Sequence, residues 1–381
     1  ISERYDANGF ATGGFIANGY ISDRFGFDQG WDRYRNYIRE NVSNEAENVF
    51  GEAADWAIEH KDERFFLYVH TIDPHVPYRP PQSFLEMYGG GDYNGPIQAG
   101  RTAQVLEEIK LGRLRATPRD RAFLEALYDG EITYHDTHFG SILEGLERRG
   151  LMDETLVVFT ADHGEEFFEH ESVGHGHSLF EELLHVPFIL SAPGYAATRV
   201  DTPARLQDVV PTVLDALGED VPDDLPGRSL LPLMLGELPS APVPSVAGFM
   251  EGWRALVLGR YKLIQRTHRT SMVFDLQEDP HEHHDIAGER PLLLRYLRAM
   301  LGLVLAGQSG SVHEAETTVI DAETEAQLEA LEQWRVLFVQ SGYNAQAVIN
   351  AIVRSPYFRS PTHTLQRAPR PPRAAAHRRL A

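Results

Sequence analysis

The chain has 381 residues, of which 42% are hydrophobic, so it can bury a large core as one α/β domain or as two domains. Its formal net charge of −21 argues against a polyanionic partner such as nucleic acid, because no basic stripe is available to neutralise phosphates. It contains no cysteine, which excludes disulfides, thiolate metal sites and a cysteine nucleophile. No run of about 18 apolar residues occurs, so we expect no membrane-spanning helix.

Strand-like and helix-like segments alternate along the first two thirds of the chain. Short segments rich in β-branched and aromatic residues predict strands over residues 12–17, 64–70, 155–160 and 186–190. Helical spacing of apolar residues predicts helices over residues 49–60, 121–149 and 208–217. Gly150 and Gly218 follow the second and third of these helices as C-caps. This alternation predicts a parallel sheet with helices on both faces.

The pattern changes in the last third of the chain. Pro and Gly cluster over residues 222–244, and the apolar segments that follow predict an antiparallel sheet and then a helix over residues 291–305. The basic Pro/Ala tail from Gln366 is expected to be disordered. We therefore predict an α/β core over residues 1–235, an antiparallel subdomain over 236–306, and a poorly assigned helical segment with the tail over 307–381.

Side chains that can bind metal ions follow two of the predicted strands. They are His70, Asp73 and His75 after one strand, and Asp162 and His163 after another. Ligands of open α/β sheets bind outside the carboxyl ends of the strands. A carboxylate and an imidazole on adjacent residues can ligate one divalent ion. Either set taken alone also fits an ordinary capped loop.

A third set of candidates lies in a histidine-rich loop. His175 and His177 flank Gly176, so both rings can lie on one side of a tight turn and contact an oxyanion or a second metal ion. His185 fits a packing residue better, and His170 fits a solvated loop residue. Because all three sets lie at one edge of the predicted sheet, we expect a metal-assisted site that acts on an anionic ester.

Five motifs, in their order and spacing, resemble the sulfatase family of the alkaline phosphatase superfamily. They are IDPHVPY, FTADHGE, HGHSLFEELLHVPFIL, DVVPTVLDALG with GRSLLPLM, and MVFDLQEDPHEHHDIA. The resemblance runs from about Phe10 to about Ala287. It implies an alkaline-phosphatase-like α/β fold, in which a doubly wound, mostly parallel sheet is joined by a smaller C-terminal antiparallel sheet and helix.

The resemblance also implies roles for individual residues. Asp162 and His163 match the second pair of metal ligands in the family, and His75 matches the histidine that contacts the sulfate or the leaving oxygen. One divalent metal ion is implied, with calcium as the first choice and manganese, magnesium or zinc as alternatives. The run 281–285 (HEHHD) falls in a C-terminal turn of the family and is expected to be solvated.

The sequence departs from the family at two places that contact the substrate. Family members usually carry a lysine at the position of Gly176, which His175 and His177 flank here. Asn18 and Tyr20 stand where many arylsulfatases have lysine and histidine. Fixed cations are thus replaced by neutral or titratable groups, which leaves room for phosphoryl or phosphonate esters.

These matches predict a sulfuric ester hydrolase in which His75, His175 and His177 are catalytic. The same histidines, with Asn18 and Tyr20, are predicted to bind a small-molecule or glycan sulfate ester. The alternatives are a phosphodiesterase, a phosphonate hydrolase or a phosphoethanolamine-type transferase on the same scaffold, and a non-catalytic remnant that binds an anion or a partner. The sequence leaves the oligomeric state open and favours a periplasmic or exported protein.

The nucleophile of the family does not occur in this sequence. That group is a formylglycine made from Cys or Ser in a C/S-x-P-x-R motif, and the nearest stretch here, SPYFR from Ser355, has its proline in the wrong place. The chain also begins without an initiator methionine or a signal-peptide pattern. We therefore interpret it as a fragment that lacks the N-terminal part with the nucleophile, and we expect it to be inactive by itself.

Overall fold

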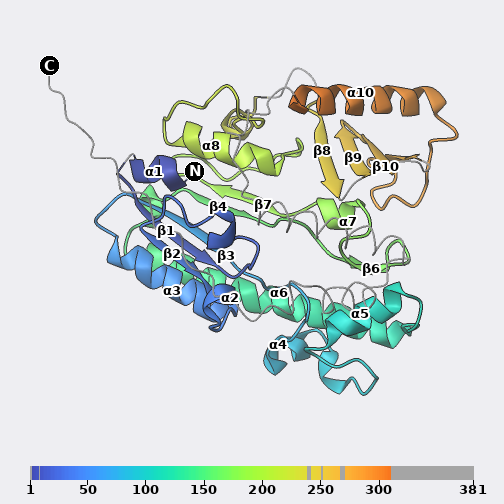
Figure 1. Ribbon diagram of the computed structural model, residues 1–381, viewed down its shortest axis with the longest axis horizontal. Coiled ribbons are helices and arrows are strands. Elements are labelled where there is room, and N and C mark those ends of the chain that lie inside the picture. The colour runs from blue at the N-terminus through green and yellow to red at the C-terminus, as the bar shows by residue number, and fades with distance from the viewer. Residues whose placement is uncertain (1, 8, 238–241, 250–251, 267–270, 310–381) are drawn as a thin grey trace, which may run out of the picture. The chain divides into compact units, whose positions relative to one another are not determined.

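The computed structural model describes residues 2–7, 9–237, 242–249, 252–266 and 271–309 (Figure 1). Residues 1–311 group into one compact unit, and the tail predicted to be disordered lies outside the described residues. Among the helices that the structure describes, none is both long enough and apolar enough to cross a bilayer. The domain boundary predicted at residue 235 stays a prediction.

A parallel sheet of three strands, in the order β2-β1-β3, forms the N-terminal part of the fold. The strands are β1 (Ala11–Ile16), β2 (Arg33–Asn36) and β3 (Phe65–His70). Ile16 lies opposite both Asn36 and His70, so the carboxyl ends of all three strands lie at one edge. The strands predicted at 12–17 and 64–70 are confirmed, whereas β2 was missed because its sequence RYRN has no apolar run.

Helices cover both faces of this sheet, as predicted (Figure 1). One face packs against α3 (Ala46–Glu59) and α6 (Pro118–Glu147), and the other against α1 (Ser2–Ala7) and α8 (Val209–Ala216). Alternate residues of a strand point to opposite faces, so each strand supplies both cores. The first core includes Phe15, Val49, Ala53, Trp56, Tyr134 and Ile142, and the second includes Tyr5, Phe10, Val213 and Leu214.

The helix α6 is the longest among the described residues, and local signals set both of its ends. Thr117 and Asp120 form a capping box, in which Asp120 N donates to Thr117 Oγ1 at 3.2 Å and Thr117 N donates to Asp120 Oδ2 at 2.9 Å. Pro118 occupies the first turn, where a missing N–H does not disturb the helix. Gly150 just past the C-terminal end has a φ of +71°, the left-handed conformation that glycine favours.

The strands β4 (Val157–Thr160) and β7 (Phe188–Ser191) form a separate antiparallel pair. Val157 lies opposite Ser191, and Thr160 lies opposite Phe188. Both strands were predicted, but the prediction that the second one runs parallel is wrong. Antiparallel strands need no crossover helix, and residues 161–187 contain only the short helix α7 (Glu181–Leu184). The connection between β4 and β7, residues 161–187, therefore begins and ends at the same end of this strand pair.

Smaller elements complete the α/β part. Within the connection, β5 (Glu166–Phe167) pairs with β6 (Val173–Gly174) in an antiparallel manner. The remaining short helices of this part are α2 (Tyr37–Glu40), α4 (Gln82–Met87), α5 (Thr102–Lys110) and α9 (Leu231–Met234).

The C-terminal part is the antiparallel sheet predicted from the sequence. Its strands, in the order β11-β10-β9-β8, are β8 (Ser245–Phe249), β9 (Trp253–Leu258), β10 (Tyr261–Arg266) and β11 (Ser271–Asp275). The helix α10 (Pro291–Ser309) covers one face, where Leu297 and Leu301 pack on Leu263 (Figure 1). On the other face, Ile264 packs with Leu179, which lies just before α7. The sheet therefore supports the loop that precedes α7.

The core around α6 gives a direct test of this packing. Leu127 of α6 is fully buried, so Leu127→Ala should lower the free energy of unfolding by about 2–5 kcal/mol, because the lost contacts leave a cavity. The matched control is Leu111→Ala, whose side chain is 51% exposed and should cost less than about 0.5 kcal/mol. Urea denaturation measures both. Equal losses for the two variants would show that Leu127 does not pack as described.

Candidate active site

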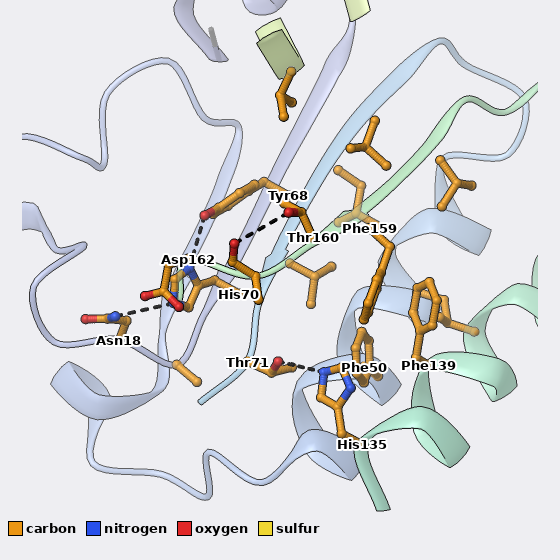
Figure 2. Close-up of a pocket in the computed structure, with 18 of the residues that line it drawn as sticks. Asn18, Phe50, Tyr68, His70, Thr71, His135, Phe139, Phe159, Thr160 and Asp162 are labelled. Carbon is orange, nitrogen blue, oxygen red and sulfur yellow. Dashed lines mark hydrogen bonds between the residues drawn. The ribbon is translucent and has the colours of Figure 1, made fainter. Parts of the chain in front are cut away.

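A cavity of about 2000 Å³ lies alongside β3 and β4. Apolar side chains of both strands and of α6 line most of it, while polar residues gather at the carboxyl ends of the strands (Figure 2). The predicted site residues on its wall are Asn18, Tyr20, His75, Asp162, His163 and His175. His177 is not among the lining residues. Of the predicted site residues, this is the one that does not line the cavity.

Three imidazole rings meet on this wall. The ring of His175 lies 5.0 Å from that of His75 and 4.4 Å from that of His163, measured between ring centroids. These histidines come from three places: the loop after β3, the turn after β4 and the loop after β6. Their convergence confirms the expectation that the separate motifs form one cluster.

His175 is held by a buried carboxylate. Glu165 Oε1 accepts from His175 Nδ1 at 2.9 Å, and Glu165 Oε2 accepts from the Tyr78 hydroxyl at 2.7 Å. The Glu165 side chain is only 4% exposed, whereas that of His175 is 27% exposed. A carboxylate can only accept when it is ionised, so Nδ1 of His175 carries the proton and its Nε2 is left to face other groups.

His177 is held by the next carboxylate along the chain. Its Nε2 lies 2.6 Å from Oε2 of Glu166, a side chain that is fully buried. Burial by itself raises the pKa of Glu166, but hydrogen bonds from His177 and from the N–H groups of Ser172 and His170 outweigh it and hold that pKa below its usual value. The expectation that His175 and His177 share one side of the turn is therefore wrong: adjacent carboxylates of an extended segment point to opposite sides, and each takes one ring.

Asp162 and His163 have the geometry of a metal half-site. The Gly164 carbonyl can only accept, so the 2.8 Å contact from His163 Nδ1 fixes the proton there and leaves the lone pair of Nε2 available. Asp162 Oδ2 lies 3.9 Å from that Nε2. Two ligands bound about 2.0–2.6 Å from one ion lie roughly 3–4 Å apart, so the pair fits a divalent ion. Within the described residues, no third His, Asp or Glu joins the pair.

Gly164 fixes the place of this half-site. Its N–H donates to the Leu183 carbonyl of α7 at 3.0 Å. A Cβ atom at position 164 would lie 2.0 Å from the Glu182 carbonyl oxygen, so any other residue would push the turn away from α7. The glycine is therefore needed for close approach, a role that the sequence alone did not reveal.

Asn18 takes part in a hydrogen-bonded chain that ends at Tyr68. Asn18 Oδ1 accepts from Tyr20 N at 2.9 Å, which turns Nδ2 toward His70 Nε2 at 3.3 Å. His70 Nδ1 then donates to the Tyr68 hydroxyl at 3.0 Å. Burial lowers the pKa of His70, against the opposing effect of Asp162, so its ring is neutral at pH 7. Figure 2 shows Asn18, His70 and Asp162 together at one end of the cavity.

The loop that carries His75 is fixed by two carboxylates, one half-buried and one buried. Asp73 Oδ2 accepts from Ala46 N at 2.8 Å, and Glu131 Oε1 of α6 accepts from Arg79 N at 2.5 Å. Burial raises the pKa of both carboxyls, that of Glu131 to about 7. His75 itself is exposed, with its Nδ1 on the Val76 carbonyl at 2.7 Å. These hydrogen bonds hold the loop between β3 and α4 in place.

Other predicted positions differ from the expectation. Tyr20 is 82% exposed and contributes its backbone N–H rather than its ring to the chain described above. His185 is exposed and is not a packing residue. His170 is half-buried and stacks on Phe180 at 3.6 Å, so it is not a solvated loop residue. In the run 281–285 the histidines are exposed as predicted, but Glu282 is buried because its side chain meets the buried Lys262.

Sequence reasoning missed Glu165 and Glu166, which hold the two histidines. A signal was present, because two acidic residues directly follow the FTADHG motif and precede an apolar pair. It also missed Lys110 of α5, whose Nζ donates to the His175 carbonyl at 3.0 Å. No local pattern links residue 110 to residue 175, so only the tertiary structure shows that contact.

The sulfatase family model matches residues 3–219, more than half of the chain. The chain belongs to the sulfatase family. Sulfatases generally use a divalent metal ion, which agrees with the ligand geometry of Asp162 and His163.

Curated relatives match part of the chain at moderate identity. The multifunctional alkaline phosphatase superfamily protein PehA from Trinickia caryophylli is 28% identical over 59% of this chain and 52% of its own length. The chain spans about half the length of the curated relatives that it matches.

Solved structures confirm the fold. A protein solved with its substrate D-glucosamine-2-N,6-O-disulfate aligns with a TM-score of 0.65 at 17% identity, over 84% of this chain and 83% of that one. The phosphonate monoester hydrolase of Agrobacterium radiobacter aligns with a TM-score of 0.63 at 20% identity, over 80% and 79% of the two chains. At such identities the likeness establishes the alkaline-phosphatase-like fold.

The buried Glu131 predicts a pH dependence of stability. Its pKa is raised by burial from 4.5 to about 7, so the folded chain binds this proton more tightly than the unfolded chain does. The contribution of this proton to the free energy of unfolding is therefore fully present below about pH 4.5 and is lost as the pH rises through about 7. Glu131→Gln keeps an acceptor for Arg79 N and removes the titration. Relative to this variant, the wild type should lose stability between pH 5 and pH 7.5 in urea melts, and parallel curves would contradict the assignment.

Proposed function

We propose that the chain forms the part of a sulfuric ester hydrolase site that binds a divalent metal ion and handles the oxygens of the ester. The observation that carries this proposal is the convergence of His75, His163 and His175 beside Asp162. Asp162 and His163 suit a metal ion, and the rings of His75 and His175 line the same cavity.

The proposed metal ion would be held by Asp162 and His163. When bound, such an ion polarises an ester oxygen and supports charge that develops on it. Calcium is the first choice from the family resemblance, while an imidazole ligand also suits manganese or zinc. The protein contributes the fixed tautomer of His163, because the Gly164 carbonyl takes the Nδ1 proton.

His175 and His75 are proposed to act on the oxygens of the ester. Glu165 holds the proton of His175 on Nδ1, so Nε2 can accept a proton and, once protonated, donate it to a leaving oxygen or a nonbridging oxygen. The buried carboxylate also stabilises the imidazolium form that this step requires. His75, 5.0 Å away, is placed to contact a second oxygen of the same group. His177 remains a predicted catalytic residue, but its bond to Glu166 favours a positioning role.

A phosphonate or phosphate ester is the second candidate substrate. The position where family members usually carry a lysine is Gly176, and the groups near it are imidazoles rather than a fixed cation. The relative PehA is described as multifunctional, and a structural neighbour is a phosphonate monoester hydrolase. An imidazole is neutral or positively charged according to whether it is protonated, so it can contact esters whose charge differs from that of a sulfate ester.

Metal binding tests the first part of the proposal. Asp162→Ala should weaken calcium binding at least tenfold in isothermal titration, because one of two protein ligands is lost. Asp129→Ala is the control, since Asp129 lies on α6 and takes no part in the half-site. Binding that is unchanged in Asp162→Ala would sink the assignment of the half-site, and a chain without any metal binding would favour the non-catalytic remnant.

Catalysis tests the second part, on the complete gene product with 4-nitrophenyl sulfate and a phenyl phosphonate ester. His175→Asn should lower kcat/KM by about 10²–10⁴-fold for the preferred ester, the range for a general acid or base. His281→Asn, a change at an exposed histidine that does not line the cavity, should have little effect. The ratio of the two wild-type kcat/KM values decides between sulfate and phosphonate. A His175→Asn variant within twofold of the wild type would refute the proposed role.

A further inference from the structure

A second cluster of ligand-type side chains lies between α7 and the C-terminal sheet, and it includes neither Asp162 nor His163. It consists of His170, Glu182 and Glu282, with one nitrogen or oxygen atom of each within 4.8 Å of the others. His170 Nε2 lies 3.4 Å from Glu182 Oε1. Among the described residues, this is the only group of three or more His, Asp and Glu side chains that meets this distance.

The three atoms that face one another are buried and lack hydrogen bonds. They are His170 Nε2, Glu182 Oε1 and Glu282 Oε1, and none receives a hydrogen bond from the part of the chain that the structure describes. The Glu282 side chain is fully buried, and Lys262 Nζ lies 3.0 Å from its Oε1 without hydrogen-bond geometry. Buried acceptors without donors are unfavourable, so this arrangement calls for a positive charge among them.

The local charge balance also favours a cation. The fully buried Lys262 Nζ contacts Glu181 Oε1 at 2.8 Å and Glu282 Oε2 at 3.0 Å. With Glu182 the cluster holds three carboxyls and one ammonium, so its ionised form carries two uncompensated negative charges. Burial, reinforced by the nearby carboxylates of Glu166 and Glu169, raises the pKa of Glu182 to about 7. A divalent cation would offset the two negative charges.

The side chains of the cluster are held in place by contacts that do not use the three atoms. The ring of His170 stacks on Phe180 at 3.6 Å with an interplanar angle of 13°. Glu282 Oε2 accepts from Glu181 N at 2.6 Å, the first residue of α7. These contacts fix the orientation of the His170 ring and of the Glu282 carboxylate. They direct His170 Nε2 and Glu282 Oε1 toward the same point, where Glu182 Oε1 also lies.

We propose that His170, Glu182 and Glu282 bind a divalent transition-metal ion, zinc or manganese, at a structural site distinct from the Asp162–His163 half-site. One imidazole nitrogen and two carboxylate oxygens suit these ions, whereas calcium and magnesium prefer oxygen ligands throughout. The ion joins three segments: the loop after β5, the helix α7 and the turn after β11. It thereby fixes the C-terminal sheet against the loop that leads to His175.

Metal titration of the full chain tests this site. Asp162→Ala provides the background, because it removes a ligand of the proposed catalytic ion. In this background, zinc chloride or manganese chloride alone should bind with a stoichiometry near one and raise the Tm. Adding Glu182→Gln should weaken that binding at least tenfold. The Gln amide can donate to His170 Nε2, so the doubly substituted chain keeps its fold. Glu171→Gln, at an exposed position in the same loop, is the matched control and should leave binding intact.

Two results would overturn the site. Equal binding with and without Glu182→Gln would show that the ion binds elsewhere in the chain and not at this cluster. No binding and no rise in Tm in the Asp162→Ala background would show that the cluster holds no metal ion. Neither result depends on hydrolytic activity, so failure of this site and failure of the proposed function are separate outcomes.

Discussion

Two adjacent buried carboxylates, Glu165 and Glu166, determine how the loop between β4 and β7 presents its histidines. Glu165 holds His175 on the wall of the cavity, and Glu166 holds His177 away from it. Because each carboxylate is buried, losing its partner would leave an unpaired charge in a low-dielectric environment, which is strongly unfavourable. The direction of each ring is therefore fixed by the fold rather than by the flexibility of the Gly176 turn.

The same loop depends on the C-terminal sheet. Leu179 packs on that sheet, and Lys262 of β10 joins Glu181 of α7 to Glu282 of the turn after β11. This buried ion-pair network and the apolar contacts beside it connect segments about a hundred residues apart in sequence. The smaller sheet thus has a direct part in placing the candidate site, although none of its strands supplies a predicted catalytic residue.

Much of the fold could be predicted because its signals are local. The strands at β1, β3, β4 and β7, the long helix α6 with its cap, and the antiparallel sheet with α10 all follow from apolar spacing and turn residues. The direction of β7 could not be predicted in this way, since an apolar run of four residues is the same in either orientation. The strand β2 escaped notice because its polar sequence gives no burial signal.

For the candidate site, the sequence by itself determined which chemistry is available: a carboxylate and imidazoles that follow strand ends, and an ordered set of motifs that resembles the sulfatase family. Residue type and spacing carry that information because they are properties of the chain. Only the tertiary structure decided that His75, His163 and His175 meet, that His177 turns to Glu166, and that Glu282 is buried against Lys262. Those outcomes depend on burial and on partners far away in sequence, which no local pattern encodes.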